Sequence, residues 1–304
     1  MCGNHTWTYL FIARDRMFGL PGNFQEYRCA KCGLVRLQPK PSKEQMNKYY
    51  PSAKYYSYKR TINYNFFRSL RSYLIYHQYR PTLLSWILEL FVRVPAMPST
   101  KSGRILDIGC GSGETLSLLQ SLGWDVYGLD INASAIKVAR KQGLNHVSLG
   151  SYEDMKKYPD NFFDVIRMYH VIEHLHDPER CLRFARKKLK DNGELIVGTP
   201  NAASLIAKVA KQYWYNLDSP RHLYIFTPKT LRRLMTTDGF VNFKMNYCSA
   251  GGLVGSLQYI VQEKLLRKID FINNLWLVIA WYPLEWLLDR FGAGDVFVLS
   301  ARKT

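Results

Sequence analysis

Residues 105–114 of the chain read Ile105-Leu106-Asp107-Ile108-Gly109-Cys110-Gly111-Ser112-Gly113-Glu114. A short apolar run leads into glycines at alternate positions, and a helical pattern begins at Glu114. Glycine lets the backbone turn tightly and approach a ligand, and the start of a helix offers unpaired N–H groups. The stretch therefore predicts a strand, a ligand-binding turn and a helix.

Short apolar runs alternate with amphipathic helical segments on both sides of this turn. The expected strands are 105–108, 125–129, a short one near Val147, 163–168, 194–198, 241–248 and 296–301, and the expected helices are 114–122, 133–142, 178–189 and 228–236. Strands that alternate with helices indicate a parallel sheet covered by helices. We therefore expect an α/β fold with a Rossmann-like sheet of about seven strands.

Three regions are expected along the chain. Residues 1–40 are rich in Gly, Pro, Cys and Arg and are interpreted as a small irregular leader. Residues 41–101 are basic and aromatic, and helical spacing over 64–93 around Pro81 predicts a helical connector. Residues 102–304 hold the α/β domain, with an insertion at 251–291 that is interpreted as two amphipathic helices.

The composition limits the class of protein. Apolar residues make up 47% of the 304 positions and charged residues 22%, which excludes a disordered or fibrous chain. Six scattered cysteines and the absence of an export signal favour a reducing, cytoplasmic compartment. The longest apolar run, 275–288, contains Pro283 and Glu285 and is shorter than the roughly 18 residues that a spanning helix needs.

The charge balance points to acidic partners. The chain has 42 Lys and Arg against 24 Asp and Glu, a formal charge of +18. The basic residues interleave with apolar positions and no nucleic-acid module is present, so an anionic membrane surface or a phosphorylated substrate is favoured over nucleic acid. The insertion combines tryptophans with basic residues in a pattern typical of interfacial helices, namely Trp276, Trp281, Trp286, Lys264, Arg267, Lys268 and Arg290. Peripheral attachment at the inner membrane surface is one interpretation, and a cap over the active site or a dimer contact is the other.

An acid at the end of the second predicted strand completes the ligand signature. Asp130 can accept hydrogen bonds from both hydroxyls of a ribose. Glu114 is a poor neighbour for a pyrophosphate, which disfavours a dinucleotide, although an NAD-dependent oxidoreductase remains an alternative. The spacing of the glycines behind Asp107 suits a ligand with a cationic centre and an amino group, such as S-adenosylmethionine.

From Arg104 to Thr199 the chain resembles the class I S-adenosylmethionine-dependent methyltransferases. The resemblance is carried by the glycine turn, by Phe163-Asp164-Val165-Ile166, by Val171-Ile172-Glu173-His174-Leu175, by Gly193-Glu194-Leu195 and by Pro200-Asn201. Segment 218–228 and the cysteine-containing segment 15–41 resemble blocks of a bacterial subgroup linked to sugars, glycans and other small metabolites.

The resemblance implies a set of cofactor contacts. Asp107, Gly109, Cys110, Gly111 and Gly113 are expected to border the methionine end, Asp130 and Ile131 to hold the ribose, and Ser151 and Tyr152 to contact the adenine. Many relatives have an acidic residue at the position of Ser151. Tyr169 and His170, at the end of the fourth strand, are also expected beside the cofactor.

Methyl transfer needs alignment and, for a hydroxyl acceptor, a base. His174 and His222 are the candidate bases because both follow strands at the expected ligand-binding edge, and Glu173 is expected to orient a loop or a histidine. His170 and His174 also have the spacing of a metal pair, a less favoured alternative. We expect transfer to a hydroxyl, or less readily to carbon, of a small acceptor that carries a sugar, a phosphate or a nucleotide-sugar.

Other functions remain as alternatives. Enzymes that methylate base amines often carry an Asn/Asp-Pro-Pro-aromatic motif where this chain has Met168-Tyr169-His170-Val171. An RNA methyltransferase therefore ranks second and a non-catalytic binding module last. The sequence does not indicate an oligomeric state.

The leader contains a candidate metal site. Cys29 and Cys32, followed by Gly33, have the spacing of a zinc knuckle, and Cys2 with His5 could supply two further ligands. Relatives with such leaders usually begin with two cysteines at this place. Structural zinc is one interpretation, and reduced thiols without metal are the other.

Overall fold

The computed structural model describes the chain except residues 1, 4, 51–64, 80, 93, 95, 250 and 266–268. Part of the predicted connector, together with Arg267 and Lys268 of the predicted interfacial cluster, lies outside the described residues.

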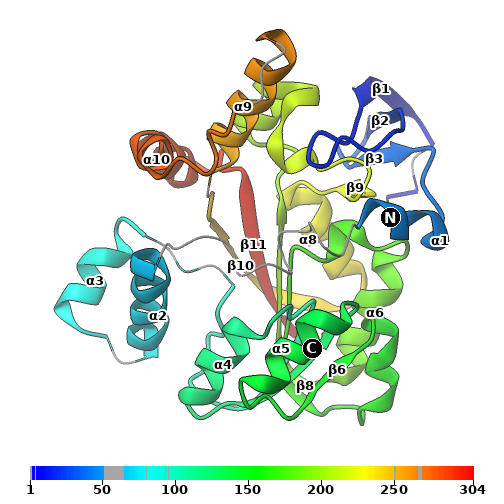
Figure 1. Cartoon of the computed structure of the whole chain (residues 1–304). Coiled ribbons are helices and arrows are strands. Elements are labelled where there is room, and N and C mark those ends of the chain that lie inside the picture. The colour runs from blue at the N-terminus through cyan, green and yellow to red at the C-terminus, as the bar shows by residue number, and fades with distance from the viewer. Residues whose placement is uncertain are drawn as a thin grey trace.

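A seven-stranded sheet forms the centre of the molecule, in the order β10-β11-β8-β7-β4-β5-β6 (Figure 1). Strands β4, β5, β6, β7 and β8 are parallel, and β11 lies antiparallel between β8 and β10. The strands are β4 (Arg104–Ile108), β5 (Asp125–Asp130), β6 (Val147–Leu149), β7 (Phe163–Tyr169), β8 (Leu189–Pro200), β10 (Phe240–Tyr247) and β11 (Val296–Lys303). The predicted Rossmann-like fold is confirmed.

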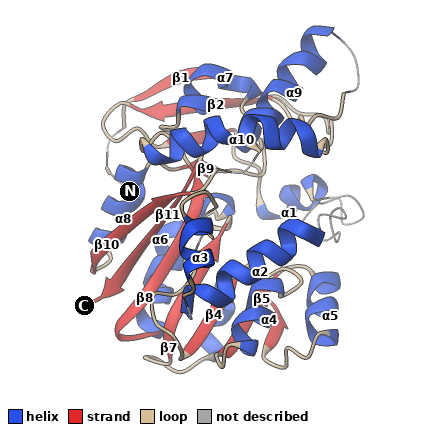
Figure 2. Cartoon of the chain, turned by 90° about the vertical axis from the view of Figure 1, so that its left-hand side faces the viewer, coloured by secondary structure: helices blue, strands red, loops and turns tan. Residues whose placement is uncertain are grey.

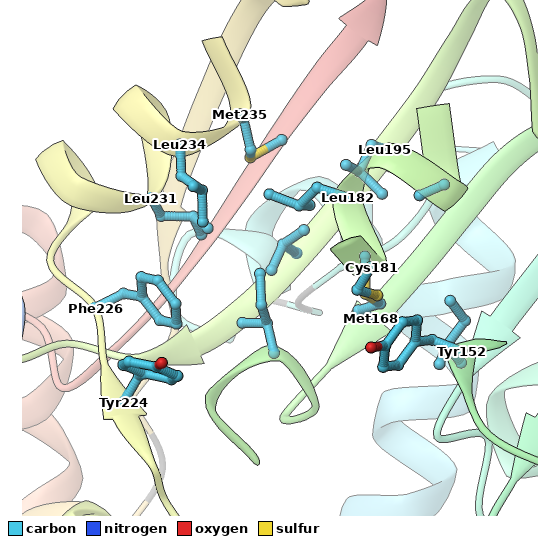
Figure 3. Packing of buried hydrophobic residues seen from close by; sticks show 14 of the residues in the cluster. Tyr152, Met168, Cys181, Leu182, Leu195, Tyr224, Phe226, Leu231, Leu234 and Met235 are labelled. Atoms are coloured by element: carbon cyan, nitrogen blue, oxygen red, sulfur yellow. The ribbon is translucent and has the colours of Figure 1, made fainter. Parts of the chain in front are cut away.

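Helices cover both faces of this sheet. They are α4 (Glu114–Ser121), α5 (Ala133–Lys141), α6 (Pro178–Lys188) and α8 (Pro228–Thr237). Each apolar stripe is buried: α8 places Leu231, Leu234 and Met235 against Leu182 of α6 (Figure 3). Burying one such side chain contributes about 1.5–3 kcal/mol. Asp177 and Thr227 cap α6 and α8, each followed by a proline at the first helical position, where no N–H is needed.

The leader is more regular than the sequence indicated. It folds into three antiparallel strands, β1 (Trp7–Ala13), β2 (Phe24–Cys29) and β3 (Val35–Gln38), and a two-residue strand β9 (Tyr224–Ile225) extends them into a second sheet. Alternating burial along β2 and β3 reflects one face packed on the core. Because β9 comes from the α/β region, the leader is joined to it by main-chain hydrogen bonds. The division of the chain at residues 40 and 101 stays a prediction.

The connector and the insertion are helical. The connector contains α1 (Lys43–Met46), the 3₁₀ turn η1 (Asn47–Tyr49), α2 (Asn65–Tyr79) and α3 (Leu83–Glu89). The predicted helix over 64–93 is interrupted near Pro81, which has no N–H to donate, and Thr82 caps α3. The insertion forms α9 (Gly252–Leu265) and α10 (Leu275–Arg290), as predicted. Figure 2 shows α9 and α10 above the large sheet, on the same side as β1 and β2.

Short elements complete the fold at the ends of the strands. They are η3 (Tyr152–Lys157), η4 (Ile172–His174), α7 (Leu205–Ala210), η5 (Lys211–Tyr213) and η6 (Tyr215–Leu217). The sequence analysis did not predict them because each is too brief to show a period. Among the described residues, no helix is both long and apolar enough to cross a membrane.

Candidate functional site

The turn between β4 and α4 has a backbone that requires glycine. Gly109, Gly111 and Gly113 have φ values of 73°, 55° and 78°, in the left-handed region. A Cβ on Gly109 would lie 2.5 Å from Cγ2 of Val171, and one on Gly113 would lie 2.2 Å from Cδ1 of Leu144. The alternating glycines are therefore needed for the path of the chain from β4 into α4.

Asp130 and the glycine turn meet, as the two-part signature predicts. Oδ2 of Asp130 accepts a hydrogen bond from the N–H of Gly111 at 2.8 Å, and Oδ1 accepts one from the N–H of Asn132 at 2.8 Å. Burial raises the pKa of Asp130, although the two backbone hydrogen bonds oppose the shift. Ile131 follows with 66% of its surface exposed, so its side chain is available to a ligand.

Asp107 is engaged by a residue that the sequence analysis missed. Nη1 of Arg167 lies 2.8 and 2.9 Å from the two carboxylate oxygens of Asp107, and both side chains are buried. Nε of Arg167 also donates to the carbonyl oxygen of Ala96 at 2.9 Å. Asp107 is thus neutralised inside the sheet, directly before the glycine turn. An arginine in the middle of an otherwise apolar strand was the signal that could have revealed this pair.

The other expected cofactor residues differ in how they are placed. Ser151 caps η3 by accepting the N–H of Glu153 at 3.2 Å. The ring of Tyr152 is buried among core side chains near Met168 and Cys181, so the side chain does not present itself to an adenine (Figure 3). Cys110 is also buried, and burial raises the pKa of its thiol.

Tyr169 and His170 follow at the end of β7. Their rings lie edge to face with centroids 4.6 Å apart, and the Tyr169 hydroxyl lies 3.8 Å from Sγ of Cys248. His170 has a positive φ of 55° and its Nδ1 lies 3.2 Å from Oε1 of Glu173. The strained backbone at His170 turns the chain sharply from β7 into η4.

Glu173, His174 and His222 form a cluster. From the sequence, the two histidines were expected only to lie at the same ligand-binding edge of the sheet. Ligand atoms of the three side chains lie within 4.8 Å of one another, and the two imidazole rings have centroids 4.6 Å apart. Oε1 of Glu173 lies 4.0 Å from Nε2 of His222, and Oε2 accepts the hydroxyl of Thr199 at 2.9 Å. The cluster lies at the carboxyl end of β7, where ligands bind in open α/β sheets.

Charge in this cluster is distributed unequally. Burial alone would raise the pKa of Glu173, but the hydrogen bond with His170 and the charges of three histidines lower it to about 2. Burial, assisted by His174, lowers the pKa of His222 to about 4. Near neutral pH, Glu173 is therefore ionised and His222 is uncharged.

Main-chain contacts fix the orientation of both imidazoles. Nδ1 of His222 lies 2.9 Å from the carbonyl oxygen of Asn216, and Nδ1 of His174 lies 3.0 Å from that of Arg221. With a proton on each Nδ1, both Nε2 atoms are acceptors. The hydroxyl of Tyr50, which the sequence analysis did not select, lies 2.9 Å from Nδ1 of His174.

Arg221 anchors the cluster to the leader. Its buried guanidinium contacts both oxygens of Asp218 and donates to Oδ1 of Asp15 at 2.8 Å and to the carbonyl oxygen of Tyr49 at 3.2 Å. The guanidinium carbon of Arg221 also lies 4.8 Å from the centroid of the Phe18 ring. The leader therefore holds the segment that carries His222.

The three leader cysteines meet, but His5 does not join them. Sulfur atoms of Cys2, Cys29 and Cys32 lie within 4.8 Å of one another, and those of Cys2 and Cys29 are 3.4 Å apart. His5 is exposed and is not part of the group. Three thiols at this spacing could hold a metal ion.

A cavity of about 740 Å³ lies between the leader and the insertion. Its lining includes Arg16, Phe18, Tyr215, Gln258, Tyr259 and Asn273. Arg16 is paired with Glu263 at 2.8 Å, and Tyr215 directly precedes Asn216, the residue that holds His222. Aromatic rings and amide groups in one cavity suit a small polar ligand.

Comparison with known proteins identifies the class. The family model described as a methyltransferase domain matches residues 76–244, more than half of the chain, so the chain belongs to this family. Together with the fold, this makes the protein a class I S-adenosylmethionine-dependent methyltransferase. The comparisons give no support to the RNA-methyltransferase or NAD-dependent alternatives.

Curated relatives include enzymes named ubiquinone biosynthesis O-methyltransferase. The protein from Xanthomonas oryzae is 31% identical over 128 residues, 40% of this chain and 54% of the relative. The protein from Bordetella avium is 28% identical over 130 residues, 41% of this chain and 52% of the relative. The chain thus spans about half the length of the curated relatives it matches.

Solved structures with a similar fold include two methyltransferases. One, from Thermotoga maritima, is 22% identical with a TM-score of 0.49, and the match covers 76% of this chain and 99% of that one. The other, phosphoethanolamine N-methyltransferase 2 from Haemonchus contortus, is 18% identical with a TM-score of 0.45, covering 80% and 58%.

Proposed function

We propose that this methyltransferase transfers a methyl group to a hydroxyl of a small acceptor, with His174 as the base. When bound, S-adenosylmethionine supplies an electrophilic methyl group on a sulfonium. The glycine turn, Asp130 and exposed Ile131 fit this cofactor, because the turn that leads into α4 lies beside a carboxylate that can accept ribose hydroxyls. The buried ring of Tyr152 leaves only its main chain for an adenine contact.

The observation that carries the proposal is the pairing of an accessible histidine with a buried acid. His174 is partly exposed, whereas His222 and Glu173 are buried, so His174 can reach an acceptor. Nε2 of His174 would take the proton of the acceptor hydroxyl, whose oxygen bonds to the methyl carbon as the carbon–sulfur bond breaks and a neutral thioether leaves. Glu173 stabilises the resulting imidazolium, and His222 positions the ring beside it.

The relatives and the cavity support a small-molecule acceptor. The curated relatives are named as O-methyltransferases. The described lining of the cavity offers rings and amides, which suit a hydroxyl-rich ligand such as a glycan unit or nucleotide-sugar, and Arg16 there is already paired. A carbon acceptor is less favoured.

Substitution of His174 tests the base. We expect His174→Ala to lower kcat by about 10²–10⁴-fold while leaving donor affinity within about twofold. Small-metabolite extracts incubated with a deuterium-labelled methyl donor provide the acceptor, and mass spectrometry detects the labelled product. His146→Ala, which changes an exposed histidine that stacks on Tyr127, serves as the control. Full turnover by His174→Ala would refute the assignment, and a product labelled on carbon or nitrogen would refute the acceptor class.

The leader is proposed to hold structural zinc. Cys2, Cys29 and Cys32 supply three ligands, and His5 is not placed to supply the fourth. We expect the purified protein to contain about one zinc ion per chain and Cys29→Ser to lose it. Equal zinc content in both proteins, or none in either, would exclude the site.

A further inference from the structure

Helix α10 buries Glu285 and exposes several of its apolar residues. Glu285 is its one buried residue, 1% exposed, and its carboxylate accepts the N–H groups of Gly251 and Leu253 at 2.8 Å each, at the start of α9. Trp276, by contrast, is 79% exposed. A surface helix in water ordinarily shows the opposite pattern. Within the part of the chain that the structure describes, the outer face of α10 therefore has no apolar neighbour that covers it.

Helix α3 shows the same pattern, with a polar residue buried and apolar residues exposed. Ser85 is its one buried residue, whereas Leu83 is 76% exposed and Leu84, Trp86 and Ile87 are exposed as well. A capping box between Thr82 and Ser85 stabilises the start of the helix. It also keeps Ser85 on the buried side, so the apolar side chains face outward.

The two helices form one surface. The carbonyl oxygen of Leu90 accepts Nε1–H of Trp286 at 2.8 Å and a guanidinium N–H of Arg290, and that of Phe91 accepts the hydroxyl of Tyr282 at 2.7 Å. Figures 1 and 2 show α3 and α10 on the same side of the molecule. We define the α3–α10 surface by six exposed residues, Leu84, Trp86, Ile87, Trp276, Ile279 and Leu287.

Acidic groups are nearly absent from the outward side of this surface. Helices α3 and α10 contain three acids, and Glu285 is buried. Asp289 accepts the N–H and the hydroxyl of Ser249 at 2.8 and 2.6 Å. Glu89 is the third acid of these two helices. Residues 41–101, which include α3, contain ten Lys and Arg but two Glu, and the whole chain carries +18. Two such copies repel each other, whereas an anionic surface attracts them.

We propose that the α3–α10 surface docks on an anionic lipid bilayer. An interfacial helix combines an exposed apolar face with tryptophan and basic residues, and α10 has exposed Trp276 and exposed Arg290. With 16 residues, α10 is about 24 Å long, and it contains Pro283, so it lies along the bilayer rather than across it. The inference is independent of the reaction, because docking requires neither donor nor acceptor.

Vesicle flotation tests the surface directly. The full-length protein is floated with vesicles of phosphatidylcholine alone and of phosphatidylcholine mixed with phosphatidylglycerol. We expect binding to the anionic vesicles, and a loss of about tenfold or more in partitioning for the double variant Leu84→Glu/Trp276→Glu. The control is Ile12→Glu, which places one added negative charge at an exposed position of β1, away from the α3–α10 surface, and should bind like wild type.

Two further measurements separate the outcomes. Acyl chains brominated in the anionic vesicles should quench wild-type tryptophan fluorescence more than that of the double variant, and circular dichroism checks that all variants fold. Failure of wild type to float, or equal flotation of both variants, overturns the proposal. So does light scattering that shows a wild-type dimer dissociated by Leu84→Glu/Trp276→Glu, because a second copy would then cover the surface.

Discussion

The carboxylate of Asp130 accepts the N–H of Gly111 at 2.8 Å, so the acid at the end of β5 is tied to the glycine turn that follows β4. The same carboxylate accepts the N–H of Asn132 at 2.8 Å, which fixes the start of α5. One side chain thus connects the glycine turn after β4 with the start of α5.

Replacing Asp130 should weaken donor binding. In Asp130→Asn an amide nitrogen must face one of two N–H donors, which removes a charge-assisted hydrogen bond of about 1.5–3 kcal/mol. We expect the Kd for S-adenosylmethionine, measured by titration calorimetry, to rise by about 10–100-fold. Asp125→Asn is the matched control, because Asp125 lies on the same strand but is partly exposed and pairs with Arg104. An unchanged Kd in Asp130→Asn would contradict the assignment of the ribose site.

Gly113 in the glycine turn and Gly143 after α5 allow the steric cost of an added Cβ to be separated from the conformational cost of a positive φ. Gly113 and Gly143 have φ values of 78° and 84°, but a Cβ would lie 2.2 Å from Leu144 in the first and meet nothing within 4 Å in the second. We expect Gly143→Ala to cost about 1–2 kcal/mol of unfolding free energy, and Gly113→Ala at least about 1 kcal/mol more. Urea denaturation measures both. Equal losses would show that the packing around Gly113 yields without cost.

The buried side chains of Arg167 and Asp107 should be energetically coupled, so that losing one of them lowers the unfolding free energy more than losing both requires. Arg167→Met removes the cation that faces the buried carboxylate of Asp107, and such a change typically lowers the unfolding free energy by about 3–5 kcal/mol. The double variant Arg167→Met/Asp107→Asn should recover part of that loss, because no uncompensated charge remains. A double-mutant cycle in urea gives the coupling energy. Additive losses would mean that the two side chains do not interact in solution.

The parts of the fold that the sequence predicted are those set by local pattern. Apolar runs of strand length and the glycine turn at 109–113 determine the large sheet, and the meeting of Asp130 with Gly111 follows because parallel strands share one carboxyl edge. Seven expected strands and the two inserted helices are present for this reason.

Contacts between distant segments could not be predicted in the same way. Tyr50 and His174 are 124 positions apart, and β9 has two residues, too few to show an alternating pattern. Arg221 joins Asp15 and Asp218 through geometry that exists only after the leader packs. Arg167 is a charged residue inside the buried strand β7, which the apolar pattern of the strand does not predict. The reason is its ion pair with Asp107, which only the folded structure shows.

A buried acid directly before β11 should make stability depend on pH. Asp295 is fully buried, and burial raises its pKa from the ordinary 3.8 to about 7, although Ser204, Trp214 and Asn216 donate hydrogen bonds to it. Between these two values the folded state binds a proton that the unfolded state does not, so this group's contribution falls as pH rises from about 4 to about 7. At about 1.36 kcal/mol per unit, the effect is at most about 4 kcal/mol.

Removing the titrating group should flatten that dependence. In Asp295→Asn the decline of unfolding free energy between about pH 4 and pH 7 should become smaller than in wild type. The variant also loses stability at every pH, because its amide nitrogen cannot accept and must face one of three donors. Urea denaturation at several pH values measures the slope. Asp270→Asn, at an exposed acid of the insertion, should keep the wild-type slope. If Asp295→Asn keeps it too, Asp295 is ionised throughout this range and its three donors outweigh the cost of burial.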